Sequence, residues 1–447
     1  LPQAIEGWDT EKGYPSIGSE KYIGIISLRR GIVSSLNVAA ARVLMENVTT
    51  QAAAQYLVNL GVDSSRVSAT GSGLALGTTG ITPIEMAAAY GAIGNMGEYL
   101  EPLSFTRVVD GEGRVVLDAA EIRKSRQVFK QTTAYMLVDM LTDAVNNGTG
   151  TSAKIKGMTV AGKTGTNSDY GSAYFAGITP YYSAVVWVGH DSYEQKLVSG
   201  STGGKVAAPL WHEFMEKIHT DLVDKPIIDA SPVELGLVKR TVCAVSGKLA
   251  TEACSFDANG LTPITDWFDK STAPTESCDM HVLTSVCMDS EQPASPYCTN
   301  VQTKSILLVG TQSYFASFDA GLLQKYLPNA VLTDITAEQY NLYASTTTCP
   351  LHSYAGWGNG GGTGISIGGN NASLIAAANA LISDVEAYLS AAQNLSETDR
   401  NNLVSLSDTL AAYLNANLYQ QAETYYERLR YTFDVIYAEN PPVTAIP

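Results

Sequence analysis

One short stretch, VAGKTGT at residues 160–166, combines a cation, two hydroxyls and two glycines. Lys163 supplies a positive charge, and Thr164 and Thr166 supply hydroxyl groups that can hydrogen-bond a carboxylate. Gly165 lacks a side chain, so a ligand or a second backbone can approach closely. If the segment is an edge strand, its free N–H groups can bind an extended peptide, and one of them can stabilise an oxyanion. Taken alone, the stretch also fits a glycine-rich strand end with an exposed lysine.

A second candidate is Ser35-Leu36-Asn37, a hydroxyl and an amide two residues apart just before a helical pattern. In an irregular turn both side chains can face one cavity, where Ser35 relays a proton and Asn37 holds an amide of a substrate. Both residue types are also frequent helix caps. By itself the pair is therefore explained more simply as a cap.

Periodicity indicates the elements that position these residues. Four helices are predicted first, at residues 37–48, 51–60, 83–95 and 130–146, with Thr50 as the cap of the second. Apolar or β-branched runs then predict three strands, at residues 158–160, 173–178 and 183–188. The short connection between the last two strands requires an antiparallel pair, and residues 207–219 read as a closing helix. This order predicts an α+β layered domain, an antiparallel sheet flanked by helices.

Composition bounds the function. The 447 residues carry a net charge of −16, from 28 Lys and Arg against 44 Asp and Glu. Phosphate neutralisation needs clustered basic side chains, and none occur, so we expect no nucleic-acid partner. No uninterrupted apolar run reaches the roughly 18 residues of a membrane span. The first residues do not have the basic and apolar regions of a signal peptide.

All six cysteines lie in the second half of the chain, and their spacings are unlike the paired CxxC of many zinc sites. They are Cys243, Cys254, Cys278, Cys287, Cys298 and Cys349. We therefore expect disulfides rather than a metal site, and an oxidising, extracytoplasmic location. No cofactor and no metal ligands are predicted. The five histidines are scattered, near no carboxylate cluster, and are expected to be structural or exposed.

Four regions follow from these patterns. Residues 1–225 form the α+β domain, and residues 226–350 form a cysteine-rich, loop-dominated module that we expect to be disulfide-linked. Residues 351–371 read as a glycine-rich linker. Residues 372–441 read as a helical hairpin or three-helix bundle, with a Ser396-x-x-Asp399 capping box.

The motifs and several longer segments together resemble one family. SSLN and KTGT occur in the order of the S-x-N and K-T-G motifs of penicillin-binding proteins. The chain is also similar to class A (bifunctional) penicillin-binding proteins over about residues 1–220, and its cysteine segments VCAVSGKLATEAC and APTESCDMH resemble sequences that follow that transpeptidase domain. The longer segments that carry the resemblance are GIISLRRGIVSSLNVAAA, GLALGTTGITPIEMAAAYGAIGNMGEYLEP, NGTGTSAKIKGMTVAGKTGT, AYFAGITPYYSAVVWVGHD and AAPLWHEFM.

The resemblance implies a β-lactamase/transpeptidase-like fold and a role for each motif residue. Ser35 shuttles a proton, Asn37 bonds the amide of the substrate side chain, and Lys163 tunes Ser35 and the local field. The hydroxyls of Thr164 and Thr166 bind the terminal carboxylate of the substrate or of a β-lactam, and the Thr166 N–H forms half of an oxyanion hole. Gly165 keeps the strand open to ligand.

One family motif is missing. The family nucleophile is the serine of S-x-x-K, upstream of S-x-N, yet none of the 16 lysines here has a serine three residues before it. The nearest approximations are Thr151 before Lys154 and Thr202 before Lys205, both downstream of S-x-N. We therefore expect a C-terminal fragment with an N-terminally incomplete domain. The S-x-x-K, a glycosyltransferase domain and a membrane anchor are expected before Leu1.

The resemblance implies a peptidoglycan D,D-transpeptidase with an acyl-serine mechanism on D-Ala-D-Ala stem peptides, located on the extracytoplasmic face of a bacterial membrane. Expected ligands are stem peptides and β-lactam antibiotics, and proteins of the division or elongation machinery are candidate partners. A D,D-carboxypeptidase is the alternative enzyme. A non-catalytic penicillin-binding-like module that binds the wall or a partner is the alternative outside enzymes.

Overall fold

A computed structural model describes residues 24–69, 71–77, 79–192, 194–290, 293–294, 298–310, 327, 330–332, 349, 351, 371–392, 395–416 and 419–439. They belong to two compact units. Unit 1 comprises Leu1–Ala250 and Leu261–Cys278, and unit 2 comprises Thr251–Gly260 and Asp279–Pro447. The expected glycine-rich linker at residues 351–371 lies almost wholly outside the described residues.

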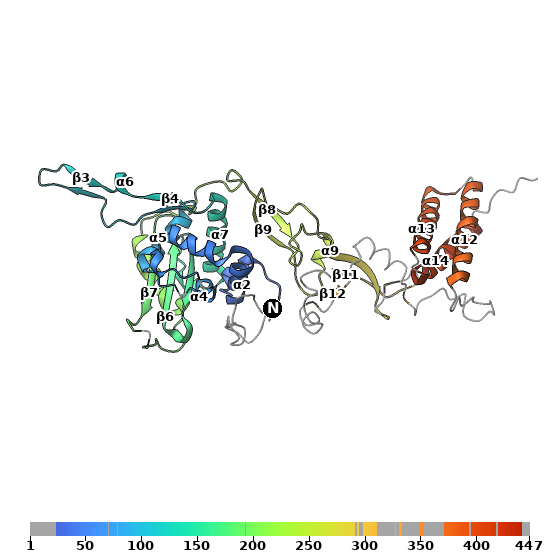
Figure 1. Cartoon of the computed structure of the whole chain (residues 1–447), viewed down its shortest axis with the longest axis horizontal. Coiled ribbons are helices and arrows are strands. Elements are labelled where there is room, and N and C mark those ends of the chain that lie inside the picture. The colour runs from blue at the N-terminus through green and yellow to red at the C-terminus, as the bar shows by residue number, and fades with distance from the viewer. Residues whose placement is uncertain are drawn as a thin grey trace, which may run out of the picture. The chain divides into compact units, whose positions relative to one another are not determined.

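Unit 1 contains both candidate motifs (Figure 1). Its α-helices are α1 (Leu28–Val33), α2 (Asn37–Val43), α3 (Thr50–Asn59), α4 (Gly71–Leu76), α5 (Pro83–Gly94), α6 (Ala119–Ile122), α7 (Gln131–Asn147) and α8 (Ala208–Ile218). Its strands are β1 (Glu98–Leu100), β2 (Arg107–Val109), β3 (Val115–Asp118), β4 (Ser125–Gln127), β5 (Ala161–Thr166), β6 (Ser172–Ile178), β7 (Ser183–Gly189), β8 (Leu237–Val242) and β9 (Ile264–Asp269). Short π and 3-10 turns are η1 (Leu44–Val48), η2 (Ser64–Arg66), η3 (Thr151–Ala153), η4 (Ser168–Tyr170) and η5 (Gly203–Ala207).

The central sheet has the order β5-β6-β7, and both pairings are antiparallel. This confirms the predicted antiparallel connection and the α+β class. The first strand was placed wrongly, however, because residues 158–160 precede β5. Met158 instead bridges to Ile155 across a turn in which Gly157 has a φ of +75°. The strand is therefore the Gly-Lys-Thr-Gly segment itself.

Successive side chains along a strand point to opposite sides of the sheet. Helices pack against both sides of this sheet. On one face, Phe175 of β6 packs against Trp211 of α8, with their ring centroids 5.1 Å apart. On the other face, Ile178 packs with side chains of α7, including Val138 and Leu141. The result is a three-layer arrangement in which α7 lies directly against β5.

Unit 2 begins with α9 (Glu252–Ser255) and a sheet of β10 (His281–Cys287), β11 (Val301–Val309) and β12 (Ala330–Leu332). Strand β11 is antiparallel to β10 and parallel to β12. The expected disulfides stay a prediction, and the sulfur atoms of Cys287, Cys298 and Cys349 in this unit lie within 4.8 Å of one another. Five of the six cysteines of the chain are buried.

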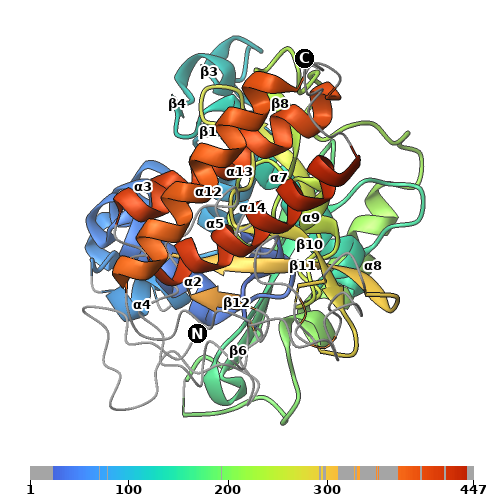
Figure 2. The ribbon, with the colours of Figure 1, turned by 90° about the vertical axis from the view of Figure 1, so that its right-hand side faces the viewer.

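The last three helices are α12 (Asn371–Ala391), α13 (Glu397–Asn415) and α14 (Tyr419–Glu439), which lie side by side (Figure 2). Leu381, Leu410 and Leu429 are among their fully or nearly buried core residues. The Ser396 hydroxyl accepts the N–H of Asp399 at 3.1 Å and caps α13. By length and composition, Leu374–Ala391 of α12 could cross a membrane, but its side chains form part of this core.

Candidate functional site

Ser35 lies immediately beyond α1 in a strained backbone conformation. The Ser35 N–H donates to the Ile32 carbonyl at 3.1 Å, and the Leu36 N–H donates to the Gly31 carbonyl at 2.9 Å. These two bonds form a Schellman motif at the C-terminus of α1. In this motif the residue just after the helix cap has a left-handed backbone conformation and is usually glycine. Ser35 accordingly has a φ of +55°. A non-glycine residue in this region carries backbone strain, which the surrounding contacts must offset.

The Ser35 hydroxyl accepts a hydrogen bond from the Lys163 ammonium at 2.6 Å, across 128 residues of sequence. Lys163 also donates to the backbone carbonyl of Thr164 at 3.1 Å. Burial disfavours the charged ammonium and lowers the Lys163 pKa to about 8. The structure therefore joins the two sequence candidates and pairs a hydroxyl with a lysine that can lose its proton near neutral pH.

Helix capping does not explain the Ser35-Leu36-Asn37 segment. The N-cap position of α2 is Leu36, which makes no side-chain capping bond. Asn37 is the first residue of α2, two positions after Ser35. The helix-cap interpretation is therefore not supported for Ser35, because its hydroxyl bonds Lys163 of the sheet instead.

Strand β5 is an edge of the central sheet, because β6 is the only strand paired with it among the described residues. In the antiparallel register, Gly165 faces Tyr174 and Thr166 faces Ala173. The Asn167 N–H donates to the Ser172 carbonyl at 3.0 Å, which makes the 167–172 pair a hydrogen-bonded pair. Since such pairs alternate along an antiparallel ladder, the N–H groups of Thr164 and Thr166 point to the open edge.

Two glycines allow β5 its close contacts. A Cβ on Gly162 would stand 2.6 Å from Phe175 Cζ and 2.9 Å from the Ala176 carbonyl. A Cβ on Gly165 would stand 3.1 Å from Tyr174 Cβ. Any larger residue at position 162 must therefore push against the sheet core.

The threonine hydroxyls of β5 have partners that sequence reasoning missed. The Thr164 hydroxyl lies 2.6 Å from that of Thr149, which follows α7. The Thr166 hydroxyl accepts the N–H of Gly203, at the start of η5, at 3.0 Å. The glycine-rich segments around 148–150 and 203–204 signalled close backbone approach, but their sequence does not show which strand they approach.

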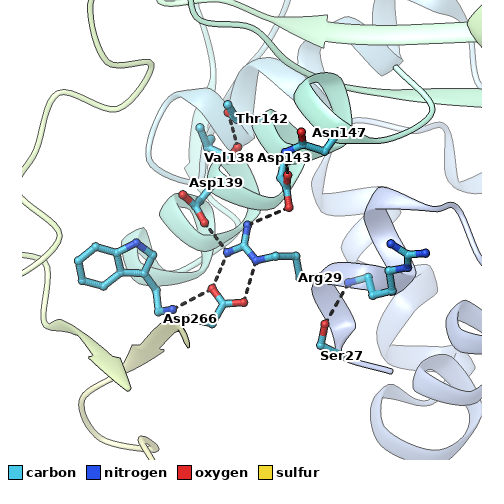
Figure 3. A network of polar contacts seen from close by, with 10 residues as sticks. Ser27, Arg29, Val138, Asp139, Thr142, Asp143, Asn147 and Asp266 are labelled. Carbon is cyan, nitrogen blue, oxygen red and sulfur yellow. Dashed lines mark hydrogen bonds and ion pairs between the residues drawn. The ribbon is translucent and has the colours of Figure 1, made fainter. Parts of the chain in front are cut away.

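A network of charges anchors α1 (Figure 3). The Arg29 guanidinium binds Asp139 on α7 and both oxygens of Asp266 on β9, one of them at 2.8 Å. Asp143, one turn further along α7, lies 3.8 Å from the same guanidinium. Ser35 lies six positions after Arg29, so this network holds the short helix that presents the Ser35 hydroxyl.

The 447-residue sequence contains no S-x-x-K motif. The site around Lys163 presents a hydroxyl, a cation and outward N–H groups that can bind an extended substrate. It does not include the serine that S-x-x-K supplies.

Comparison with known proteins follows the same division. Residues 3–216 match the penicillin-binding protein transpeptidase domain, and residues 233–283 match the C-terminal domain of penicillin-binding protein 1A. Penicillin-binding protein 1A of Clostridium botulinum (strain Hall) is 35% identical over 276 residues, which are 60% of this chain and 32% of that protein. The Aquifex aeolicus protein of the same name is 32% identical over 214 residues, 47% of this chain and 28% of that one.

A solved structure shares the fold. Penicillin-binding protein 1A from Haemophilus influenzae superposes with a TM-score of 0.50 at 23% identity, over 59% of this chain and 43% of that chain. The chain spans about a third of the length of the curated relatives it matches. The chain thus carries a penicillin-binding protein transpeptidase domain followed by a penicillin-binding protein 1A C-terminal domain.

Proposed function

We propose that this chain supplies the substrate-binding part of a D,D-transpeptidase site that takes D-alanyl-D-alanine stem peptides and β-lactams. The observation that carries the proposal is the Lys163–Ser35 hydrogen bond of 2.6 Å beside the open edge of β5. A stem peptide would add to that edge as a further strand, bonded by the exposed N–H groups.

In this proposal each motif residue has one task. The hydroxyls of Thr164 and Thr166 bind the terminal carboxylate, which Lys163 also attracts while it is protonated. The outward N–H of Thr166 donates to the oxyanion that forms on the attacked carbonyl. Asn37 bonds the amide of the substrate side chain, and Gly165 leaves room for the peptide backbone.

The bond-making steps require a serine that this sequence does not contain. In a complete site, the serine oxygen would attack the carbonyl between the two D-alanines and release the last one as its amine takes up a proton. An amine from a second stem would then displace the serine and form the cross-link. Ser35 and Lys163 would pass the proton between the serine oxygen and the departing or arriving amine.

A second candidate is a non-catalytic module that binds the wall or a partner, because no S-x-x-K occurs among the 447 residues. The two candidates share the binding site and differ only in chemistry. For either, we propose an extracytoplasmic location at a bacterial membrane, where peptidoglycan stems are found.

Binding can be tested without turnover. Amide chemical shifts of the 447-residue chain would be recorded during titration with an N-acetylated peptide that ends in D-alanyl-D-alanine. We expect saturable shifts at Thr164 and Thr166, and a binding constant about tenfold weaker for Thr166→Val, which lacks the hydroxyl to the charged carboxylate.

The experiment has two controls, one variant and one peptide. Thr220→Val removes a hydroxyl just after α8 that donates to the Lys217 carbonyl at 2.9 Å, and this variant should bind the peptide as the parent does. The L-alanyl-L-alanine peptide should not compete. Equal binding of both peptides, or shifts that avoid β5, would refute the proposal.

A further inference from the structure

Strand β9 lies within residues 233–283, which match the C-terminal domain, yet it packs against helices of the preceding transpeptidase domain. Its antiparallel partner is β8 of the same C-terminal domain. Both strands and both helices that β9 touches, α1 and α7, belong to unit 1. The binding of a peptide at β5 does not by itself explain why a strand of the following domain should contact these helices.

Two side chains of β9 contact one face of α7. The Thr132 hydroxyl donates to Asp269 Oδ2 at 2.9 Å. The rings of Tyr135 and Trp267 meet edge to face, with their centroids 6.0 Å apart. The Lys239 ammonium, from β8, lies 4.7 Å from the centroid of the Trp267 ring. Residues three positions apart on a helix share a face, so a polar and an aromatic contact together fix β9 to this side of α7.

Asp266 extends the contact from β9 to α1 (Figure 3). Both of its carboxylate oxygens accept hydrogen bonds from the Arg29 guanidinium, one of them at 2.8 Å. The Trp267 N–H donates to Asp266 Oδ1 at 2.8 Å and so orients the carboxylate. The same guanidinium binds Asp139, one helical turn beyond Tyr135 on α7. One cation therefore joins β9, α7 and α1.

Helix α1 needs such external support. It has six residues, whereas isolated helices shorter than about 12 residues are marginal in water. Among these six residues, all of which the structure describes, Val33 alone is buried. The end of α1 sets the place of Ser35, whose N–H bonds the Ile32 carbonyl and whose hydroxyl bonds Lys163. A shift of α1 would therefore move that hydroxyl away from Lys163.

We propose that strand β9 makes the C-terminal domain a positioning module of the peptide site. Asp266 holds α1 through Arg29, and α1 presents the Ser35 hydroxyl to the sheet. Asp266 acts through another residue, so it is a positioning residue and not a catalytic one. The inference rests on the proposed function, because that function is what gives Ser35 its part in peptide binding.

Amide hydrogen exchange tests the coupling without a ligand. Exchange in the 447-residue chain would be followed residue by residue by NMR. Asp266→Asn keeps the shape of the side chain and removes its charge. We expect the amides of Ser35 and Leu36, which bond carbonyls of α1, to exchange about tenfold faster in this variant. The amide of Phe175 in the central strand β6 reports on global stability and should change less.

Glu276→Gln is the matched control. Glu276 is a carboxylate of the same domain, but its side chain is exposed and pairs with Lys248 at 3.1 Å. This variant should leave the exchange of Ser35 and Leu36 as it is in the parent. Faster exchange confined to β8 and β9 in Asp266→Asn would overturn the proposal.

Arg29→Lys covers the case in which Asp266→Asn unfolds. Lysine keeps the positive charge but lacks the planar fork that binds two carboxylates, so the amides of Ser35 and Leu36 should again exchange faster. Exchange at the parent rate in a folded Arg29→Lys variant would overturn the proposal.

Titration with the N-acetylated D-alanyl-D-alanine peptide separates this inference from the proposed function. If the parent binds the peptide, Asp266→Asn should bind it about tenfold more weakly, and an unchanged affinity would overturn the positioning role. If the parent does not bind the peptide, the proposed function fails. In that case the exchange of Ser35 and Leu36 alone decides whether β9 holds this segment in place.

Discussion

Ser35 is the residue whose conformation and contacts bear most directly on whether the site is functional or only structural. A non-glycine residue at a φ of +55° costs stability, and the surrounding contacts must offset that cost. The hydroxyl bonds Lys163, which burial keeps close to losing its proton. Both features lie in motifs visible in the sequence, but neither the left-handed conformation nor the depressed pKa follows from residue type.

Replacement of Ser35 should therefore depend on the replacing residue. Glycine tolerates the left-handed conformation and alanine does not, so Ser35→Gly should be more stable than Ser35→Ala by about 1 kcal/mol. Both variants lose the hydroxyl, so the difference between them reports only the backbone conformation. Urea unfolding midpoints measure the difference. An alanine variant as stable as the glycine variant would contradict the conformation described for Ser35.

Lys163 predicts a pH dependence of stability. Its pKa is about 8 in the folded protein against an ordinary value of 10.5, so the unfolded chain binds more protons between these values. Folding stability should therefore rise with pH across that window, by up to about 3 kcal/mol for this group. Unfolding of the parent and of Lys163→Met would be followed from pH 7.5 to 10.5. The difference between them should grow in favour of the parent as the pH rises, and a constant difference would count against the depressed pKa.

At the scale of elements, the decisive features are an edge strand and an anchored helix. Periodicity predicted most helices and the β6–β7 pair, because their apolar faces are regular. It misplaced β5, since a strand made of Ala-Gly-Lys-Thr-Gly-Thr has almost no apolar pattern and is held by its neighbours. It also missed Thr149 and Gly203, which reach β5 from distant loops. Such contacts depend on tertiary packing and cannot be obtained from local sequence.

The anchor of α1 can be tested through its charges. Arg29 and Asp266 have side chains only 21% and 20% exposed, so their pair contributes more than a surface ion pair. Arg29→Met leaves Asp139 and Asp266 without their cation and should lower the free energy of unfolding by about 2 kcal/mol. The neighbouring exposed residue offers the control, since Arg30→Met should cost less than about 0.5 kcal/mol. Equal costs in chemical denaturation would show that the network does not anchor α1.

At the scale of the whole molecule, the motifs pointed to the correct family, whereas the cysteine count left the pairing of the cysteines open. The even number of six suggests disulfides, which stay a prediction. Counting cysteines cannot show which of them lie close together in the fold. The fold places S-x-N and K-T-G together as the family resemblance implied. The missing S-x-x-K was correctly read from the sequence, because its absence needs no structure.

The central claim is that this chain holds the binding groups of a penicillin-binding site without the serine that becomes acylated. The most direct test is the intact mass of the 447-residue chain after prolonged incubation with excess benzylpenicillin. The account predicts an unchanged mass, because the Ser35 hydroxyl serves as the partner of Lys163 and no S-x-x-K serine is present. A mass increase equal to one penicillin, mapped to any residue of the chain, would contradict it.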